Sequence, residues 1–358
     1  MSVTKEQVVE ALRGVNDPEL HKDLVSLGMV DNVAVCGGGV SLTINLTTPA
    51  CPLSGRIEQE VRQAIEKIPG VDKVAVKMGA MTRKSVDTGN LVPEVSHVIA
   101  VGSGKGGVGK STIASNLALG LARAGARVGL MDADVYGPNL PLMLGVTATP
   151  QSENGKILPV EAHGVKLISM GFFLKEDEPV IWRGPMLHGV MKQFLGDVSW
   201  GALDYLVIDL PPGTGDVQLT LSQVIPLSGA VVVTTPQDVA LLDARKAIAM
   251  FHKVNVPILG IVENMSGFVC PHCHEQTEIF GSGGGRRAAE RLGVPLFGTI
   301  PLDPATMRAC DTGRPLLVTD PESPQARLFM DLARAVAARV SVVAFERARP
   351  FVTIRPSA

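Results

Sequence analysis

The chain has 358 residues, of which 46% are hydrophobic and 4% aromatic, and its formal net charge is −2. This length exceeds one typical domain, and the near-neutral charge supplies no polybasic surface for nucleic acid or membranes. The N-terminus lacks the apolar core of a signal peptide, no apolar run reaches membrane-spanning length, and five cysteines are too few for a secreted disulfide framework. We therefore expect a cytoplasmic protein with reduced thiols, without a nucleic-acid or membrane partner.

Residues 1–82 predict a small α+β domain. Thr4 and Gln7 have the spacing of a capping box, which opens a short helix to about Leu12. The segments with strand or helix periodicity that follow are 30–35, 40–46, 53–68 and 71–76. The polar stretch 83–96 contains a glycine and a proline and is the expected linker.

Residues 97–345 alternate apolar strand-like runs with helical segments, which predicts an α/β fold with a mainly parallel sheet covered by helices on both faces. The runs expected as strands are 98–101, 128–131, 165–170, 205–208, 230–234, 258–262 and 296–300. A last amphipathic helix is expected over about 325–340. The stretch 341–358 is expected to be loosely ordered, with 346–358 as a tail outside the domain.

The stretch GKGGVGKS at 104–111 fits the P-loop pattern G-x-x-x-x-G-K-[ST] in full, between an expected strand and an expected helix. Its glycines let backbone N–H groups face phosphate oxygens. We expect Lys110 to reach the β- and γ-phosphates and Ser111 to ligate Mg²⁺. The residues expected around the nucleotide are Gly104, Lys105, Gly106, Gly107, Val108, Gly109, Lys110, Ser111 and Thr112.

Lys105 is an extra lysine that a P-loop acting within one chain does not need. It resembles the signature lysine of the deviant Walker A ATPases, which include MinD, ParA, the arsenite-pump ATPase and the nitrogenase iron protein. That resemblance implies a P-loop NTPase fold and a lysine that reaches the partner's phosphates across a homodimer. The competing interpretation is a solvated loop lysine.

Carboxylates follow two expected strands at the edge where ligands bind in parallel sheets. We expect Asp132 to hold Mg²⁺ through water and Asp134 to orient the attacking water, although the segment also suits a strand-ending turn. Asp209 ends an apolar strand in the Walker B form and is expected behind Mg²⁺. Gly213, in the following PPGTG segment, has the freedom to place its N–H near the γ-phosphate and to act in a switch.

Cys270 and Cys273 have C-x-x-C spacing in a loop-like stretch beyond Asn264. Two thiols bind one metal or one cluster edge, or form a redox disulfide. A homodimer would supply two such pairs, the Cys₄ ligand set of a [4Fe–4S] cluster. The rivals are a dimer-bridging Zn²⁺, a zinc site within one chain completed by His272 and His274, and a thioredoxin-like pair. The last is disfavoured because Cys270 does not open a helix.

These motifs, together with WRGPM at 182–186, DLPPGTGD at 209–216 and ENMS at 263–266, resemble the Mrp (ApbC) family of iron–sulfur carrier ATPases over nearly all of 97–340. The resemblance implies a homodimer that assembles a labile [4Fe–4S] cluster between its subunits and passes it to apo iron–sulfur proteins, with Mg-dependent ATP hydrolysis needed for delivery. It alone favours ATP over GTP. The residues it places near adenine are Asn264, Pro301 and Asp303, although an asparagine after a strand is also a common turn residue.

Three features qualify this resemblance. His274 stands where many relatives have glycine, which leaves the zinc alternative open. Residues 1–81 resemble the MIP18-like (DUF59) domain, through DPEL at 17–20, DLVSLG at 23–28 and TTPACP at 47–52, and Cys51 occupies the cysteine position of that family. Cys51 is either a handover ligand or a buried small side chain. Cys36 and Cys310 are expected to be structural.

Two functions from other classes share parts of the pattern. A positioning ATPase of the MinD or ParA type would have the P-loop and Lys105, but no use for Cys270 and Cys273. It would be expected to carry an amphipathic membrane tail or a basic DNA-binding surface, and Pro350 and Pro356 break any long amphipathic helix at the C-terminus. The second alternative function is a zinc-bridged scaffold that binds nucleotide only for stability.

Overall fold

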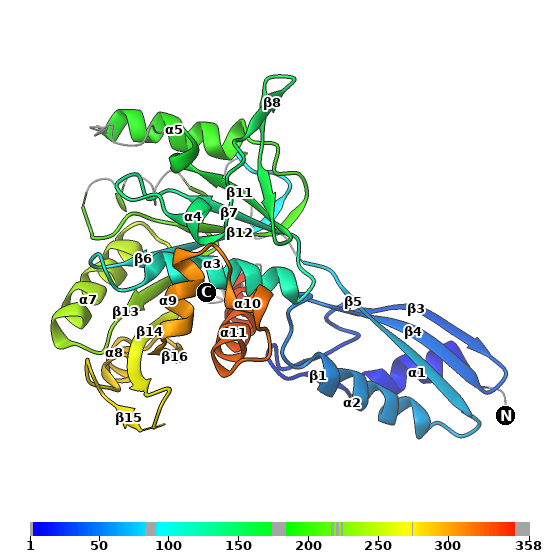
Figure 1. Ribbon diagram of the computed structural model, residues 1–358. Helices are drawn as coiled ribbons and strands as arrows, with labels where there is room; N and C mark the ends of the chain where they lie inside the picture. Colours follow the sequence, from blue (N-terminus) through cyan, green and yellow to red (C-terminus); the bar gives the residue numbers. More distant parts are fainter. Residues whose placement is uncertain are drawn as a thin grey trace, which may run out of the picture. The chain divides into compact units, whose positions relative to one another are not determined.

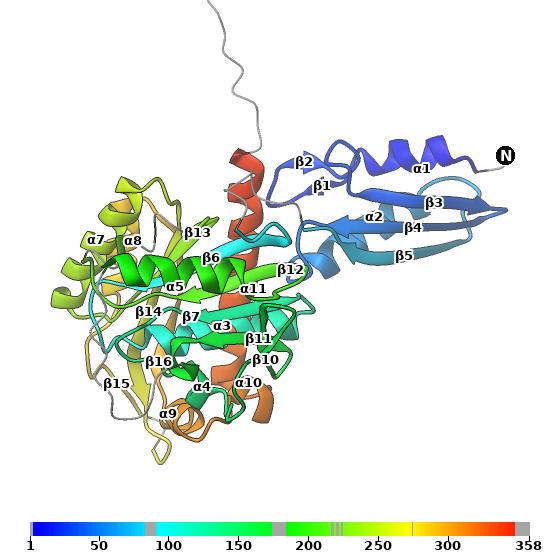
Figure 2. The ribbon, with the colours of Figure 1, turned by 90° about the horizontal axis from the view of Figure 1, so that it is seen from above.

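The computed structural model describes residues 3–82, 91–173, 184–215, 218–219, 222, 225–273 and 275–347 (Figures 1 and 2). The predicted features that fall outside these ranges are residues 83–90 of the linker, Trp182, Arg183, Asp216, His274 and the tail from residue 348. Residue contacts divide the chain into two compact units, Met1–Val86 with Ala337–Ala358, and Asp87–Val336.

The first unit contains a three-stranded sheet and two helices. Its elements from the N-terminus are α1 (Lys5–Leu12), β1 (Asn16–Asp17), β2 (Lys22–Asp23), β3 (Val30–Cys36), β4 (Gly39–Leu46), α2 (Ser54–Glu66) and β5 (Lys73–Ala80). The capping box at α1 is confirmed, since Gln7 N–H donates to Thr4 Oγ1 and Thr4 N–H donates to Gln7 Oε1. β3 and β4 form an antiparallel hairpin, and β5 pairs parallel with β4.

The end of the last helix belongs to this first unit. Residues 341–347, expected to be loosely ordered, are the last two turns of α11 (Pro324–Arg347), so that expectation was wrong. Val342 and Phe345 pack against the apolar cluster formed by α1, α2 and the sheet. Lys22 Nζ lies 5.4 Å from the centre of the Phe345 ring, a cation–π contact. Burial of these side chains explains why the helix continues.

The second unit contains the P-loop. Its remaining elements are β6 (Val95–Ser103), α3 (Lys110–Arg123), β7 (Val128–Asp132), α4 (Leu140–Met143), β8 (Gln151–Glu153), β9 (Lys156–Leu158), β10 (Val160–Ala162), β11 (Val165–Ser169), η1 (Met170–Phe172), α5 (Gly184–Gly196), β12 (Leu203–Asp209), β13 (Gly229–Thr234), α7 (Asp238–Lys253), β14 (Ile258–Val269), β15 (Gln276–Thr277), α8 (Gly284–Leu292), β16 (Leu296–Leu302), α9 (Pro304–Asp311) and α10 (Leu316–Thr319).

The main sheet has the predicted, mainly parallel form. Among the described residues its strands lie in the order β10-β11-β7-β12-β6-β13-β14-β15, with β16 paired to β14. Every pair is parallel except the two outer ones, β10 with β11 and β14 with β15. All residues of β6, β7, β12 and β13 are buried, as expected for parallel strands covered on both faces.

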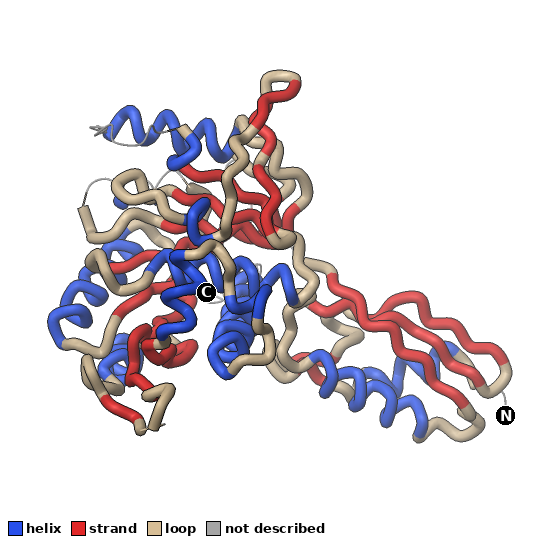
Figure 3. Tube along the Cα trace, in the orientation of Figure 1, coloured by secondary structure: helices blue, strands red, loops and turns tan. Residues whose placement is uncertain are grey.

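Helices cover both faces of this sheet (Figures 1 and 3). Side chains of α5, α7 and α8 join one apolar cluster with the strands. On the other face α3 contacts β6, β7 and β12 and packs on α11, where a Cβ at Gly120 would lie only 2.7 Å from Ala333 Cβ. None of the helices in the described ranges is both long and apolar enough to cross a membrane.

The register of the central strands assembles one polar edge. Asp209, the last residue of β12, lies opposite Asp132, the last residue of β7, and also opposite Val101 of β6. The P-loop leaves β6 two residues beyond Val101. Parallel pairing therefore brings two carboxylates and the phosphate-binding loop to the same carboxyl edge.

Candidate functional site

The loop that joins β6 to α3, the P-loop, lines a pocket of about 580 Å³, which we call the phosphate pocket. Gly107 and Gly109 adopt φ values of +77° and +80°, in the left-handed region that glycine enters without steric penalty. Gly104 is constrained by space instead, since a Cβ there would overlap the backbone of Asp243 in α7. The sequence-predicted residues that line this pocket are Lys105, Gly106, Gly107, Gly109, Lys110, Ser111, Thr112 and Asp134.

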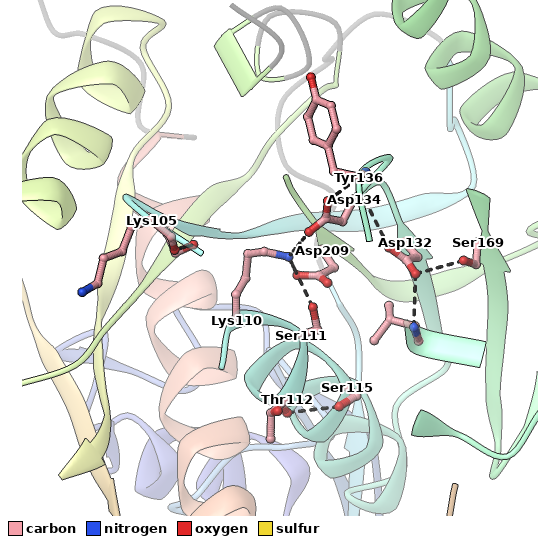
Figure 4. Close-up of polar contacts among 12 residues, drawn as sticks. Lys105, Lys110, Ser111, Thr112, Ser115, Asp132, Asp134, Tyr136, Ser169 and Asp209 are labelled. Atoms are coloured by element: carbon pink, nitrogen blue, oxygen red, sulfur yellow. Dashed lines mark hydrogen bonds and ion pairs between the residues drawn. The ribbon is translucent and has the colours of Figure 1, made fainter. Parts of the chain in front are cut away.

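Lys110 is the charged centre of this pocket (Figure 4). Its Nζ lies 2.6 Å from Asp209 Oδ1 and 3.3 Å from Asp134 Oδ2, and each of the three side chains is 10% exposed or less. Buried ion pairs of this kind persist where good geometry offsets the lost hydration. Phosphate oxygens entering the pocket would compete with the two carboxylates for the ammonium group, so Lys110 is positioned to exchange one set of anionic partners for another.

Asp209 and Ser111 fit a magnesium ion. Lys110 engages Oδ1 of Asp209, whereas Oδ2 is buried and accepts no hydrogen bond from any described residue. The Ser111 hydroxyl lies 3.4 Å from the same ammonium nitrogen. Burial raises the pKa of the Asp209 carboxyl, and the charge of Lys110 opposes this rise. An orphaned carboxylate oxygen and a neighbouring hydroxyl match the oxygen ligands that Mg²⁺ takes beside phosphates and water.

Asp132 is fully buried and organises the loop after β7. Its Oδ1 accepts the Asp134 N–H at 3.2 Å, and its Oδ2 accepts the Leu140 N–H at 3.2 Å and the Ser169 hydroxyl at 2.9 Å (Figure 4). Burial, and then the charge of Asp209, raises the pKa of Asp132 to about 8. Both oxygens are engaged by the protein, which matches the turn-forming interpretation. A water-mediated magnesium role for Asp132 stays a prediction.

The side chains of Lys105 and Lys110 point in different directions. Figure 4 shows its ammonium group pointing away from the group formed by Lys110, Asp134 and Asp209. Its backbone is held, since the Ser103 hydroxyl donates to the Lys105 carbonyl at 2.9 Å. Lys105 lines the pocket but directs its ammonium group away from these three side chains, and a role on a partner's phosphates stays a prediction.

Gly213 lies beside the start of the P-loop. It adopts φ +98°, and its N–H donates to the Ser103 carbonyl at 3.0 Å. This hydrogen bond ties the loop after β12 to the residue that precedes the P-loop. The predicted contact of Gly213 with a γ-phosphate would require this N–H to change partner.

Glu263 and Asn264 form a connection that the sequence did not reveal. Asn264 Nδ2 donates to the Val108 carbonyl in the P-loop at 2.9 Å, and a Cβ at Gly109 would overlap this nitrogen. The buried Glu263 carboxylate accepts the Ser266 hydroxyl at 2.5 Å. It also accepts the backbone N–H groups of residues 283 and 285 at the start of α8. One dipeptide of β14 thus links the P-loop to α8.

The residues predicted near adenine do not line the phosphate pocket. Asn264 is not part of the pocket lining, and its side chain bonds the Val108 carbonyl of the P-loop. Asp303 is the N-cap of α9 and accepts the Thr306 N–H at 2.7 Å, and the Pro301 carbonyl accepts Gln325 Nε2 at 3.2 Å. Adenine recognition by these residues stays a prediction.

Other pocket residues were missed by sequence reasoning. Tyr136 and Leu142, both exposed, stand at the pocket, and the Tyr136 N–H donates to Asp134 Oδ1 at 3.2 Å. Cys310 of α9, expected to be structural, also lines the pocket, with its Sγ 4.0 Å from Thr112 Oγ1. Burial raises the pKa of the Cys310 thiol. Tyr136 lies within the DADVYGPN stretch at 132–139, where no role was predicted for it, and no spacing pattern marks Leu142 or Cys310.

The cysteine pair lies on a hairpin at the edge of the sheet, where a loop-like stretch had been expected. β14 continues beyond Asn264 to Val269 and pairs antiparallel with β15. Cys270 and Cys273 lie on the turn between these strands, which the hydrogen bond from Cys270 N–H to the Glu275 carbonyl closes at 3.0 Å. The left-handed conformations of Met265 and Gly267 interrupt the regular strand pattern here, so the sequence gave no strand signal beyond Asn264.

The two thiols are accessible. Cys270 is half-buried and Cys273 is exposed. The backbone N–H groups of Cys273 and His272 lower the pKa of the Cys270 thiol. In the described part of the chain, no three His, Cys, Asp or Glu side chains are grouped to hold a metal ion. Cys270 and Cys273 therefore offer two ligands together, and the predicted contribution of His274 lies outside the described residues.

Cys51 has the opposite environment. It is buried in the apolar cluster of the first unit, and burial raises the pKa of its thiol to about 11. This placement matches the interpretation of Cys51 as a small core side chain. Cys36 is exposed at the end of β3.

Comparison with known proteins relates both parts of the chain to iron–sulfur proteins. The family model of the NUBPL iron-transfer P-loop NTPases matches residues 94–337. The model of the iron-sulfur cluster assembly protein family matches residues 5–78. The chain is 52% identical over 350 residues to the iron-sulfur cluster carrier protein of Synechocystis sp., covering 96% of this chain and 99% of that protein.

Solved structures agree with the fold of the second unit. A nucleotide-binding protein from Archaeoglobus fulgidus in complex with ADP is 39% identical, with a TM-score of 0.58, over 65% of this chain and 91% of that chain. The cell division ATPase MinD of Pyrococcus furiosus is 26% identical, with a TM-score of 0.52, over 67% of this chain and 98% of that chain.

Proposed function

This chain belongs to the family of NUBPL iron-transfer P-loop NTPases, with an iron-sulfur cluster assembly domain at its N-terminus, and we propose that it is an ATP-dependent iron–sulfur carrier. A [4Fe–4S] cluster is the cargo, held between two subunits and passed to apo-proteins. The observation that carries this proposal is the accessible pair Cys270 and Cys273 on a hairpin whose first strand also contacts the P-loop. The relative from Synechocystis sp., named as a carrier, supports it.

The residues of the pocket suit Mg-dependent ATP hydrolysis. Lys110 would hold the β- and γ-phosphates, while Ser111 and Asp209 would hold Mg²⁺, which neutralises charge on the phosphates when bound. Asp134 lines the pocket and is positioned by Lys110 and by the Tyr136 N–H, so it would orient the attacking water. The ADP complex of the Archaeoglobus fulgidus relative supports an adenine nucleotide as the ligand.

Exposed apolar side chains support a homodimer. Those on segments that follow the carboxyl ends of parallel strands are Tyr136, Leu142, Phe173, Val239 and Met307. Apolar surface of this kind on one edge of a domain is typical of a protein–protein interface. A second copy on this edge would place Lys105 of each subunit toward the partner's phosphates.

The same edge would complete the cargo site. Each subunit offers the thiols of Cys270 and Cys273, and two subunits offer the Cys₄ set that [4Fe–4S] clusters take. A dimer-bridging Zn²⁺ would use the same four ligands. Glu263 and Asn264 belong to β14, the first strand of the hairpin, and Asn264 also bonds the Val108 carbonyl of the P-loop. Phosphate binding at the P-loop would alter the hairpin through this strand, which Glu263 also joins to the start of α8.

Anaerobic reconstitution with iron and sulfide tests the proposal, with a metal count and a visible spectrum. The expected result is a broad band near about 400 nm and about four irons per dimer, both lost in Cys273→Ala. Cys36→Ala is the matched control, because Cys36 is also exposed but lies in the other unit. A colourless dimer with about one zinc would instead show a structural metal site, and the carrier proposal would fail.

A further inference from the structure

A second pocket, of about 390 Å³, lies between α7 and α8 and shares no residue with the phosphate pocket. Gly284 makes it possible, because a Cβ there would overlap the Pro236 carbonyl and lie 2.7 Å from Leu241 Cδ1. The two helices therefore approach closely at one end. Among the side chains that form the walls are Asp238, Leu241, Leu242, Arg245, Arg287 and Arg291.

The charge of this pocket is strongly positive. Arg245, Arg287 and Arg291 face it together, and none of them forms an ion pair with any carboxylate of the described ranges. Arg287 and Arg291 are one turn apart on α8, where like charges repel. The lining contains one acidic residue, Asp238, against the three arginines. An arrangement that costs stability in the free protein fits an anionic ligand.

The pocket is also apolar at its rim. Leu242 is 49% exposed, and Leu241 and Ala288 continue an apolar surface between the arginines. No aromatic side chain is part of the lining, whereas single-stranded nucleic acid is usually bound by stacking on aromatic rings. The volume suits one or two side chains better than a nucleic-acid duplex.

We propose that this α7–α8 pocket binds an acidic segment of a partner protein, with an apolar side chain of that segment against Leu241 and Leu242 and its carboxylates on Arg245, Arg287 and Arg291. Guanidinium groups pair with carboxylates through two parallel hydrogen bonds, which gives both affinity and orientation. The inference does not depend on the identity of the cargo.

The pocket also contacts the nucleotide machinery through α7. Asp243 lies between Leu242 and Arg245 in sequence, and its backbone is the one that excludes any side chain at Gly104 of the P-loop. A segment bound between α7 and α8 therefore rests on the helix that supports the P-loop. Binding of the segment and of nucleotide is expected to be coupled, with each changing the affinity of the other.

The test uses the full-length protein and a fluorescein-labelled peptide of repeated Glu-Glu-Leu triplets, followed by fluorescence anisotropy at low salt. We expect saturable binding that weakens at least about tenfold in Arg245→Glu/Arg291→Glu and severalfold in Leu242→Ser. A peptide of Gln-Gln-Leu triplets should not bind. Basal ATP hydrolysis of both variants should stay within about twofold of wild type, because none of these residues lines the phosphate pocket.

Lys253→Glu/Arg286→Glu is the matched control, because it makes the same change of net charge on the same two helices outside the pocket. Equal weakening in this control would show attraction to general positive charge and overturn the proposal. Unchanged peptide binding in Arg245→Glu/Arg291→Glu would also overturn it. Tighter binding of a single-stranded oligonucleotide with the same dependence on the arginines would identify nucleic acid as the ligand instead. A change of oligomeric state in the same variant would identify a second copy.

Discussion

The phosphate pocket and the cysteine turn lie in the same unit and are built in opposite ways. In the pocket, Lys110 is only 6% exposed and is paired with two carboxylates of its own chain. On the turn, Cys273 is exposed, and Cys270 and Cys273 are joined by no third grouped ligand within the described ranges. The contrast indicates that Lys110 and its two carboxylates are already assembled within one subunit, whereas cargo binding and the action of Lys105, as proposed, are properties of the assembly.

The sharpest way to break this comparison is Asp209→Asn. Loss of the carboxylate removes one of the two acidic partners of Lys110 and the oxygen suited to Mg²⁺, so we expect hydrolysis to fall by about 10²–10³-fold. Iron content after reconstitution should remain unchanged, because Asp209 ends β12, which β6 and β13 separate from the first strand of the hairpin, β14. Asp204→Asn is the control on the same strand, at the opposite end, where Asp204 pairs with Arg127. A parallel loss of iron in Asp209→Asn would contradict the separation of the two sites.

Lys105→Gln tests whether one residue of the pocket belongs to the assembly. We expect hydrolysis to fall about tenfold or more while nucleotide binding changes little, because the lysine would act on the partner's phosphates. An equal mixture of Lys105→Gln and Asp134→Asn subunits should recover about a quarter of wild-type hydrolysis. Half of the dimers would be mixed, and one of their two sites would have both intact residues.

The outcome of this mixing separates two arrangements. If Lys105 served its own subunit, each site of a mixed dimer would keep one defect, and the mixture would recover nothing. The pure variants, measured at the same total concentration, are the reference. Recovery would require a dimer with shared sites, whatever metal the cysteines hold.

Gly109→Ala and Gly107→Ala test how tightly the P-loop is packed against Asn264. Both positions have left-handed φ values, but only at Gly109 would the new Cβ overlap Asn264, while Gly107 faces open space. We expect Gly107→Ala to lower the free energy of unfolding by about 1 kcal/mol and Gly109→Ala by about 1–3 kcal/mol. Urea denaturation followed by circular dichroism measures both. Equal losses would mean that the contact with Asn264 is easily displaced.

The smallest effect concerns Cys51 and pH. Burial raises the pKa of this thiol to about 11, above the value of an exposed thiol, so the folded state binds its proton more tightly. Its contribution to stability is therefore fully present below about pH 8.5 and lost as the pH rises toward 11. Cys51→Ala should reduce the alkaline decline of the urea midpoint between these values. An identical decline in the variant would mean that Cys51 ionises without cost.

Cys51 also serves as the buried reference for the reactivity of the two thiols on the turn, Cys270 and Cys273. Iodoacetamide should label Cys270 and Cys273 well before Cys51, because alkylation needs an accessible thiolate. Mass spectrometry of peptides from a short labelling time distinguishes the three. Rapid labelling of Cys51 would restore its interpretation as a handover ligand.

The parallel sheet and the P-loop could be predicted from sequence because their signals are local. Buried parallel strands are apolar runs, and the P-loop fixes glycines, Lys110 and Ser111 within eight positions. Register then follows, since strands that end in Asp132 and Asp209 must meet at one edge. The sequence therefore identified the centre of the site.

The parts that could not be predicted depend on contacts between distant segments. Nothing near Glu263 in sequence indicates that its carboxylate accepts hydrogen bonds from backbone N–H groups at the N-terminus of α8. The last two turns of α11 were misjudged because their apolar partners lie in the first unit. The strand character of residues up to Val269 was missed because the stretch is irregular, with Met265 and Gly267 in left-handed conformations, and shows no simple alternation of buried and exposed residues.

β14 has one further consequence, which concerns insertions and deletions. A single strand runs from Asn264, at the P-loop, to Val269, next to the first thiol, so the spacing of the two sites is fixed by a count of residues. β14 bulges between Asn264 and Phe268, where Met265 and Gly267 adopt left-handed φ values, so the direction of Cys270 depends on this bulge as well as on the number of residues. An insertion or deletion between Asn264 and Cys270 would therefore shift the thiols relative to the P-loop and, in the proposed dimer, relative to the thiols of the partner subunit.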